Sequence, residues 1–445
     1  MVVIDLFSGA GGLTEGFYTQ GFEVIAHVEK EKWACETLKT RSCFYYLKNR
    51  NDLATYNEYL KNSIDYKTIE KSREIIFKKY PELKMKLEKE VINKAFGNPQ
   101  EEDGVVSIEE IIELIEDSMK YNNKSSVDVI IGGPPCQAYS IIGRSRMKEK
   151  VVEDKRNYLF KYYKEIVNHF SPKLFVFENV PGILTAKNGA IFNEIESEFK
   201  EIGYKLMSGK SKNHKENILN SKDFGVYENR KRMILIGVKD DFNMEYPDFL
   251  SNAGLVKEDM NTKNVIGDLP ALSPGEGEDF KVVSYSYNDK RKLSDFQKLM
   301  REDSIGVLNH KARTIKDFDS RNYKMAIEGK MEGKQIYYCD FPDDTRNHKN
   351  THGFLDRFKV HWWTDTPHTI VAHISKDGHY NIHPDINQCR SLTVREAARI
   401  QSFPDNFKFE GPRTWQYVQV GNAVPPIMAE VIARTIKQIL KEKQT

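Results

Sequence analysis

Cysteine is scarce in this sequence of 445 residues. The five cysteines are Cys35, Cys43, Cys136, Cys339 and Cys389. Their number is odd, they are widely scattered and none belongs to a CxxC motif, which argues against both a disulfide framework and a zinc site. We therefore expect no bound metal and a reducing compartment, the cytoplasm.

Long apolar runs are also missing. No stretch approaches the roughly 18 residues of a membrane-spanning helix, so we expect no membrane association. The first residues, MVVIDLF, lack the basic region and the small-residue cleavage site of a signal peptide. With 39% hydrophobic and 30% charged residues, the composition is that of a soluble globular enzyme and not of a disordered chain.

The sequence has no strong excess of charge of either sign. A net charge of +2 at pH 7 neither requires nor excludes a nucleic-acid partner. One local excess occurs in residues 205–232, which contain eight Lys or Arg and three Asp or Glu. Such a segment is either a solvated face or a surface that binds phosphates, and the sequence leaves both interpretations open.

Short apolar runs alternate with helical segments along much of the chain. Strands are expected at 1–7, 22–29, 127–133, 172–180 and 232–238. Alternation of this kind predicts an α/β fold with a doubly wound, mostly parallel, Rossmann-like sheet.

The length predicts two to three domains. We expect the sheet domain in residues 1–244, with a Lys/Glu-rich helical insertion at about 46–126 that is not a sheet crossover. Residues 245–410 lose the alternation and are expected to form a second, smaller and irregular domain. Residues 411–445 contain an amphipathic helix and are expected to return to the first domain.

A glycine-rich turn, residues 5–12 (DLFSGAGG), follows the first expected strand. Gly9 and Gly11 allow the backbone to approach a ligand closely. The second strand ends in Glu29, 18 residues after Gly11, where a carboxylate can accept hydrogen bonds from both hydroxyls of a ribose. The alternative is a surface glutamate at a helix start. Together, the two features favour an adenosine-containing cofactor.

Cys136 lies in GGPPCQAYS, residues 132–140, directly after an expected strand. Most free cysteines are small buried hydrophobes, but the prolines here fix the backbone and hold the thiol in one place. Glu178 ends the next strand behind apolar residues, either as a proton donor or as a cap of the next turn. Arg230 and Arg232, at i and i+2, would share one face of a strand and could orient Glu178 or hold an anion.

These groups suit one reaction. A thiolate can add to carbon 6 of a pyrimidine and make carbon 5 nucleophilic, a carboxyl group can hold nitrogen 3, and a cofactor can supply an electrophilic methyl group.

Seven runs appear in a fixed order: DLFSGAGGLTEGF, GGPPCQAYS, DKRNYLF, FVFENVPGI, DFGVYENRKRMILIG, LTVREAARIQSFPDNF and QVGNAVPP. In these runs the chain resembles the cytosine-5 DNA methyltransferases of bacterial restriction–modification systems. The resemblance spans nearly the whole chain and leaves out residues 46–126 and 245–370.

The resemblance implies a DNA (cytosine-5-)-methyltransferase that uses S-adenosylmethionine, releases S-adenosylhomocysteine and flips the target base out of the duplex. The implied catalytic residues are Cys136 as nucleophile, Glu178, Arg230 and Arg232. The implied cofactor-binding residues are Phe7, Gly9, Gly11, Glu29, Lys30, Pro135 and Asn422. The implied DNA-binding residues, on a loop that closes over flipped DNA, are Gln137, Ser140, Arg144 and Arg146.

The resemblance also implies partners. The expected substrate is double-stranded DNA, read at a short specific sequence by a target-recognition domain in residues 245–410. A cognate restriction endonuclease that forms no stable complex, and a monomeric state, are expected as well. Within the recognition region, Trp362 and Trp363 are interpreted as core residues ahead of base contacts.

Two departures from the family pattern stand out. Tyr227 and Glu228 replace the usual Pro-Gln before the arginine pair, which changes the support of the catalytic residues. The acidic residue expected after the third strand, near the adenine amino group, is hidden by the insertion, and Asp103 is only a guess.

Three other functions were weighed. A tRNA methyltransferase of the same chemistry is disfavoured by the large variable region, since such relatives have a reduced one. A DNA-binding protein without catalysis is disfavoured by the intact Cys136, Glu178, Arg230 and Arg232. Only the glycine turn favours a nicotinamide oxidoreductase.

Overall fold

The computed structural model describes residues 1–135, 159–209, 214–254, 258–285, 292–346 and 355–443. An eight-stranded sheet is central to it, in the order β3-β2-β1-β4-β5-β8-β6 with β7 beside β8. The strands are β1 (Val2–Leu6), β2 (Glu23–Glu29), β3 (Val91–Asn93), β4 (Val129–Gly132), β5 (Leu174–Asn179), β6 (Tyr204–Met207), β7 (Ile218–Asn220) and β8 (Lys231–Lys239).

The strands β3, β2, β1, β4 and β5 run parallel to one another. The strand β8 runs antiparallel to β5, β6 and β7. This arrangement confirms the predicted Rossmann-like α/β fold. The strand order reverses between β1 and β4, and sheets of this kind bind ligands at the carboxyl ends of the strands beside such a reversal.

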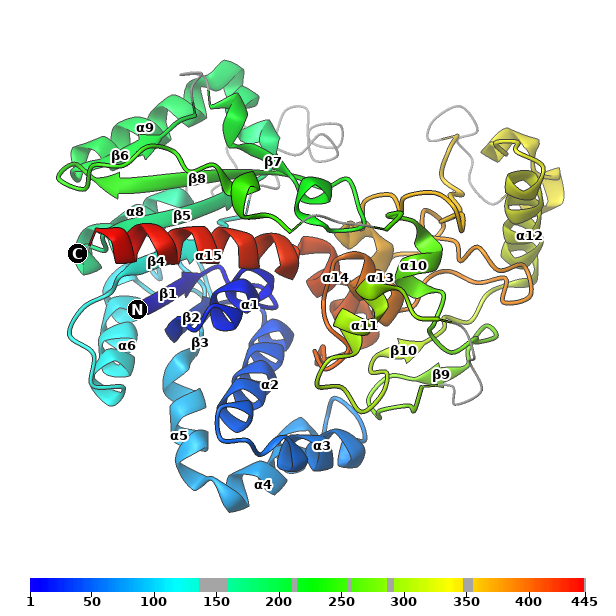
Figure 1. Ribbon diagram of the computed structural model, residues 1–445, viewed down its shortest axis with the longest axis horizontal. Coiled ribbons are helices and arrows are strands. Elements are labelled where there is room, and N and C mark those ends of the chain that lie inside the picture. Colours follow the sequence, from blue (N-terminus) through cyan, green and yellow to red (C-terminus); the bar gives the residue numbers. More distant parts are fainter. Residues whose placement is uncertain (136–158, 210–213, 255–257, 286–291, 347–354, 444–445) are drawn as a thin grey trace.

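Helices cover both faces of the sheet (Figure 1). The helices of this part of the chain are α1 (Gly12–Thr19), α2 (Lys32–Lys48), α3 (Leu53–Asn62), α4 (Ile69–Lys79), α5 (Pro81–Glu90), α6 (Ile108–Tyr121), α8 (Leu159–Phe170), α9 (Ala190–Glu201) and α15 (Pro426–Glu442), of which α3 and α4 lie away from the sheet. Successive side chains of β1 alternate between two cores: Ile4 joins residues of α6, α8 and α9, and Val3 joins residues of α1 and α15. The C-terminal helix α15 therefore packs in the same core as α1 and the sheet.

The segment 46–126 is only partly the helical insertion that the sequence suggests. The helices α3, α4 and α5 pack on one another and on α2, but β3 follows them and pairs in parallel with β2. The helix α6 then leads to β4 as a sheet crossover. The prediction was wrong for residues 91–121, because a strand of three residues between charged helices leaves almost no apolar pattern to recognise.

The described part of the segment between residues 258 and 422 lies to one side of the sheet (Figure 1). Its elements are short: α10 (Thr262–Ile266), β9 (Gly277–Glu278), α11 (Asp295–Arg301), β10 (His310–Lys311), α12 (Asp317–Met331) and α13 (Val394–Ile400), followed by α14 (Arg413–Asn422). Trp362 and Trp363 are partly buried and pack against its two hydrophobic clusters, which favours the core interpretation. Across the described ranges, no helix combines the length and apolarity needed to cross a membrane.

The contact between α1 and α15 depends on a glycine. A Cβ atom at Gly16 would lie 2.2 Å from the carbonyl carbon of Ala429, which is backbone and cannot move aside like a side chain. The two helices approach this closely only because Gly16 has no side chain.

We expect Gly16→Ala to destabilise the protein by about 2 kcal/mol or more, because overpacking against rigid backbone forces the helices apart. Urea unfolding followed by circular dichroism measures the effect. Gly254→Ala is the control, since a Cβ there would meet no atom within 4 Å. An unchanged unfolding midpoint for Gly16→Ala would contradict the assigned contact.

Candidate active site

The turn after β1 forms one wall of the candidate site. Phe7 has a positive φ of 57°, its N–H donates to the carbonyl oxygen of Val28 at 2.8 Å, and its ring stays partly exposed. Gly9 also has a positive φ, of 54°, and a Cβ there would meet no atom within 4 Å. At Gly9 the backbone of this turn therefore faces open space, as a cradle for a bound ligand requires.

Glu29, at the end of β2, is tied to this turn. Its Oε2 accepts a hydrogen bond from the N–H of Gly9 at 2.8 Å, and its Oε1 accepts one from the N–H of Glu31 at 2.7 Å. Burial raises the pKa of Glu29, and the two backbone donors oppose that shift. The carboxyl group is thus held in one orientation beside the turn, where a ribose would need it.

The other predicted cofactor residues lie around the same edge. Gly11 is the buried N-cap of α1 with a φ of 85°, Lys30 is exposed after β2, and Pro135 is partly exposed after β4. Asn422 is the exposed last residue of α14. The chain just beyond it lies against the turn, because a Cβ at Gly12 would come within 2.3 Å of the carbonyl oxygen of Val424.

Two residues that the sequence reasoning missed follow the third strand. The side-chain amide of Asn93, at the end of β3, donates to the carbonyl oxygens of Glu29 and Lys30, both at 3.0 Å. The ring of Phe96 lies 5.0 Å from that of Phe7. The residue that ends strand three is therefore an amide and not the expected acid, and Asp103 is exposed ten residues further on. Asn93 and Phe96 could be identified from the sequence only if the end of β3 were known.

Glu178 and Arg232 meet at the carboxyl end of β5. The Nε atom of Arg232, on β8, lies 2.7 Å from Oε1 of Glu178, and both side chains are mostly buried. Burial raises the pKa of Glu178, and the charges of Arg232 and Arg230 oppose this. A carboxyl group with a raised pKa and a fixed orientation is suited to hold or donate a proton.

The loop that leads to Cys136 rests on Glu178. A Cβ at Gly133 would lie 2.5 Å from Oε2 of Glu178, so a larger residue here would displace this carboxyl group. The amide of Asn179 donates to the carbonyl oxygen of Pro134 at 3.3 Å. The backbone at Gly133 therefore lies directly beside the carboxyl group of Glu178. Five predicted site residues lie outside the described residues: Cys136, Gln137, Ser140, Arg144 and Arg146.

Arg230 differs from Arg232 in its partners. Its side chain is buried, and its two terminal nitrogens donate to the carbonyl oxygens of Ile370 at 2.8 Å and Gly421 at 2.9 Å. The sequence predicts that both arginines complete the active site, and in the structure Arg232 forms an ion pair with Glu178. Arg230 acts on Glu178 through its charge and binds the neighbouring segments.

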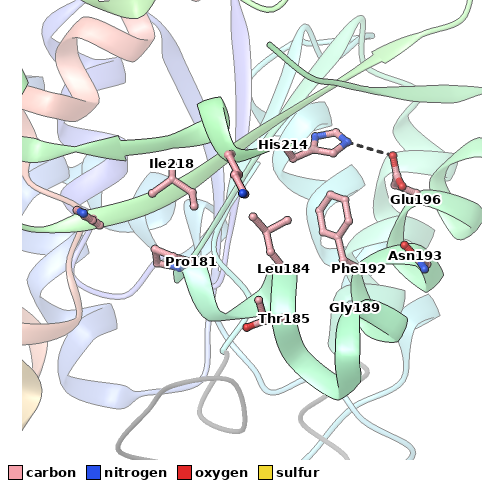
Figure 2. A pocket seen from close by; sticks show the side chains of 11 residues that line it. Pro181, Leu184, Thr185, Gly189, Phe192, Asn193, Glu196, His214 and Ile218 are labelled. Carbon is pink, nitrogen blue, oxygen red and sulfur yellow. Dashed lines mark hydrogen bonds and ion pairs between the residues drawn. The ribbon is translucent and has the colours of Figure 1, made fainter. Parts of the chain in front are cut away.

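An open cavity of about 680 Å³ lies beside this end of the sheet, against the 3₁₀ segment Pro181–Gly189 that follows β5 (Figure 2). Leu184, Phe192 and Ile218 supply apolar lining, and Lys231 lines it from the basic segment 205–232. Nε2 of His214 lies 3.2 Å from Oε1 of Glu196 at its margin. The cavity adjoins the Glu178 edge and is separate from the glycine turn.

Comparisons with known proteins show which family the chain resembles. A family model described as C-5 cytosine-specific DNA methylase matches residues 1–76 and 86–438. The Type II methyltransferase M.Bpa9945I of Bacillus paralicheniformis is 56% identical over 441 residues, 99% of each chain. The Type II methyltransferase M.DdeI of Desulfomicrobium norvegicum is 30% identical over 455 residues, 98% of this chain and 88% of that one. A candidate DNA modification methyltransferase encoded within an E. coli prophage has a similar fold, with a TM-score of 0.61 at 20% identity and 99% of both chains covered.

We expect Glu29→Ala to weaken the binding of S-adenosylhomocysteine by about tenfold or more, because hydrogen bonds from ribose hydroxyls to a carboxylate are lost. Isothermal titration calorimetry measures this without DNA or turnover. Glu23→Ala is the control, since Glu23 lies at the other end of the same strand and is largely exposed. Equal affinities for wild type and Glu29→Ala would remove Glu29 from the cofactor site.

Proposed function

The chain belongs to the family of C-5 cytosine-specific DNA methylases, and from this premise we propose how its own residues carry out the reaction. It is a DNA cytosine-5 methyltransferase that uses S-adenosylmethionine. The observation that supports the proposed mechanism best is the Glu178–Arg232 pair, which lies directly against the loop that leads to Cys136.

The cofactor fits the edge formed by the glycine turn and the end of β2. In the proposed arrangement the open backbone at Gly9 and the fixed carboxyl group of Glu29 hold its adenosine part, with Phe7, Gly11, Lys30, Pro135 and Asn422 around it. When bound, S-adenosylmethionine supplies an electrophilic methyl group.

The protein residues prepare the flipped cytosine. The thiolate of Cys136 forms a bond to carbon 6, and the electrons of the 5,6 double bond make carbon 5 nucleophilic. Glu178 donates a hydrogen bond to nitrogen 3 in its protonated form, which its burial favours, and Arg232 fixes its orientation. After methylation, loss of the proton from carbon 5 restores the double bond and releases the Cys136 sulfur.

The domain assignment is part of the proposal. Residues 1–244 and 411–445 form the catalytic region, and residues 245–410 form the target-recognition region that reads a short specific duplex sequence. Gln137, Ser140, Arg144 and Arg146 contact the DNA around the flipped base. Two curated relatives are Type II methyltransferases, which supports a restriction–modification role beside a separate cognate endonuclease. We also propose a cytoplasmic monomer.

We expect the purified protein, incubated with duplex DNA and S-adenosylmethionine, to place 5-methylcytosine in one short sequence context. Bisulfite sequencing reads the position. Cys136→Ser should leave no mark, because an alcohol does not form the adduct at neutral pH.

The adduct itself can be trapped. On duplex DNA in which 5-fluorocytosine replaces the target base, carbon 5 cannot lose its substituent, so a covalent complex should accumulate with wild type and not with Cys136→Ser. Denaturing gel electrophoresis detects it. Methylation of tRNA without methylation of DNA, or a trapped complex with Cys136→Ser, would refute the proposal.

Glu178→Gln tests the carboxyl group separately. An amide keeps the size and can still accept from Arg232, but it cannot transfer a proton to nitrogen 3. We expect kcat to fall about 100-fold or more while the affinity for DNA stays within about threefold. Glu196→Gln, a change at an exposed glutamate on α9, is the control. Wild-type kcat in Glu178→Gln would show that the carboxyl group takes no part in the reaction.

A further inference from the structure

One residue of the proposed target-recognition region, Ile370, is held through both its N–H and its carbonyl group by the segment that precedes β8. The N–H of Ile370 donates to Oε2 of Glu228 at 2.8 Å, and the carbonyl oxygen of Ile370 accepts from Arg230 at 2.8 Å. The hydroxyl of Thr369 donates to the carbonyl oxygen of Asn229 at 2.7 Å. We call Glu228, Arg230 and Ile370 the peptide clamp.

The clamp joins three parts of the molecule. Glu228 and Arg230 lead directly into β8, which carries Arg232 and so the partner of Glu178. Arg230 also donates to the carbonyl oxygen of Gly421, one residue before Asn422. Ile370 precedes the 3₁₀ turn Ala372–Ser375, which packs against α14 so closely that a Cβ at Gly421 would lie 2.2 Å from the nitrogen of Ala372.

Tyr227 adds a second tie between the same regions. Its hydroxyl donates to Oε1 of Glu258 at 2.8 Å, and its ring lies 4.4 Å from that of Phe296 on α11. Both residues that depart from the expected Pro-Gln pair therefore contact residues beyond 245. Tyr227 and Glu228, in place of Pro-Gln, therefore change the contacts between the segment before β8 and the residues beyond 245. None of these contacts involves Glu178.

Glu228 has an unusual position for an acid. Its side chain is completely buried, and within the described part of the chain its Oε1 atom has no hydrogen-bond partner. The charged groups that act on it are Arg230 and Arg232, while Ile370 offers it a backbone N–H. Burial raises the pKa of Glu228 to about 7, against the opposing effect of the two arginines.

We propose that Glu228 is a positioning residue whose bond to Ile370 sets the target-recognition region against the catalytic edge, and that this link tightens when the carboxyl group loses its proton. The proposal rests on the proposed function, because it concerns how DNA held by residues 245–410 is presented to Glu178 and Cys136. A carboxylate is a stronger acceptor than a neutral carboxyl group, so ionisation strengthens the bond to the Ile370 N–H.

As the pH rises, the bond between Glu228 and Ile370 strengthens, whereas the contribution of Glu228 to the stability of the folded protein decreases. Because the pKa of Glu228 is higher in the folded than in the unfolded state, its contribution to stability is fully present below the unfolded value and is lost as the pH rises through about 7. The ionised form of Glu228, which binds the Ile370 N–H more strongly, thus places a negative charge in the protein interior. Glu228→Gln keeps an oxygen that accepts from the Ile370 N–H. Because an amide does not titrate, the variant removes the pH dependence of this bond and the pH dependence of the stability contribution.

The experiment compares wild type, Glu228→Gln and Glu228→Ala between about pH 6 and pH 9, with kcat, the KM for DNA and the Kd for DNA measured on each. Asp279→Asn is the matched control, because burial also raises the pKa of Asp279 but its side chain makes no contact with the clamp in the described structure. Melting temperatures over the same pH range supply a readout that needs no activity.

We expect the ratio of wild-type kcat to Glu228→Gln kcat to rise several-fold as the pH passes about 7, and Asp279→Asn to show no such rise. Glu228→Ala should lower kcat about tenfold or more with the Kd for DNA within about threefold, since misplacement of bound substrate slows the chemistry without preventing binding. The melting temperature of Glu228→Gln relative to wild type should increase as the pH rises.

Two results would overturn the proposal. One is a kcat ratio that does not change with pH while the melting temperatures do, which would leave Glu228 a purely structural acid. The other is an equal loss of kcat and DNA affinity in Glu228→Ala with a pH-independent Glu228→Gln. If wild type methylates no DNA at any pH, the proposed function fails instead, and the melting temperatures alone still decide whether Glu228 titrates near neutrality.

Discussion

A buried guanidinium group needs hydrogen-bond acceptors, and Arg230 meets this need by reaching across three segments of the chain. It sits one residue before β8, and its acceptors are the carbonyl oxygens of Ile370 and Gly421. Neither acceptor belongs to the sheet, so these two hydrogen bonds of the buried guanidinium group depend on the segment around Ile370 and the end of α14 staying in place. This one side chain beside β8 therefore connects the edge of the sheet with both segments.

At three glycines near this edge, atoms of another segment lie very close to the glycine backbone. Gly12 admits the carbonyl oxygen of Val424, Gly16 admits the backbone of α15, and Gly133 admits the carboxyl group of Glu178. In each case a Cβ atom would overlap an atom that is already present. The glycines therefore do more than provide turns: they bring the C-terminal helix, the glycine turn and the end of β5 within reach of one another.

The sequence predicts most of this edge because strand ends are marked by local pattern. Glu29, Glu178 and Arg232 each end or begin an apolar run, and the parallel order of the strands brings such ends together. What it does not predict depends on tertiary contacts. The strand β3 is too short to show a period, so the sequence pattern does not identify Asn93, and Arg230 and Arg232 look equivalent until their partners are known. The buried arginines of the recognition region are a further case: Arg395 and Arg399 resemble surface residues of a charged helix, yet Arg399 is bound by Asp268 and Asp405 in the interior.

Two carboxyl groups at this edge show how environment separates roles. Burial raises the pKa of both Glu29 and Glu178, but their partners differ. Backbone N–H groups contact both oxygens of Glu29, and such donors favour the acceptor-only, ionised form that binds ribose hydroxyls. Glu178 contacts the guanidinium group of Arg232 through Oε1, while its Oε2 lies beside Gly133 on the loop toward Cys136. A buried carboxyl group held in one orientation is suited to carry a proton. These different partners are the physical basis on which we propose Glu29 for the cofactor and Glu178 for the base.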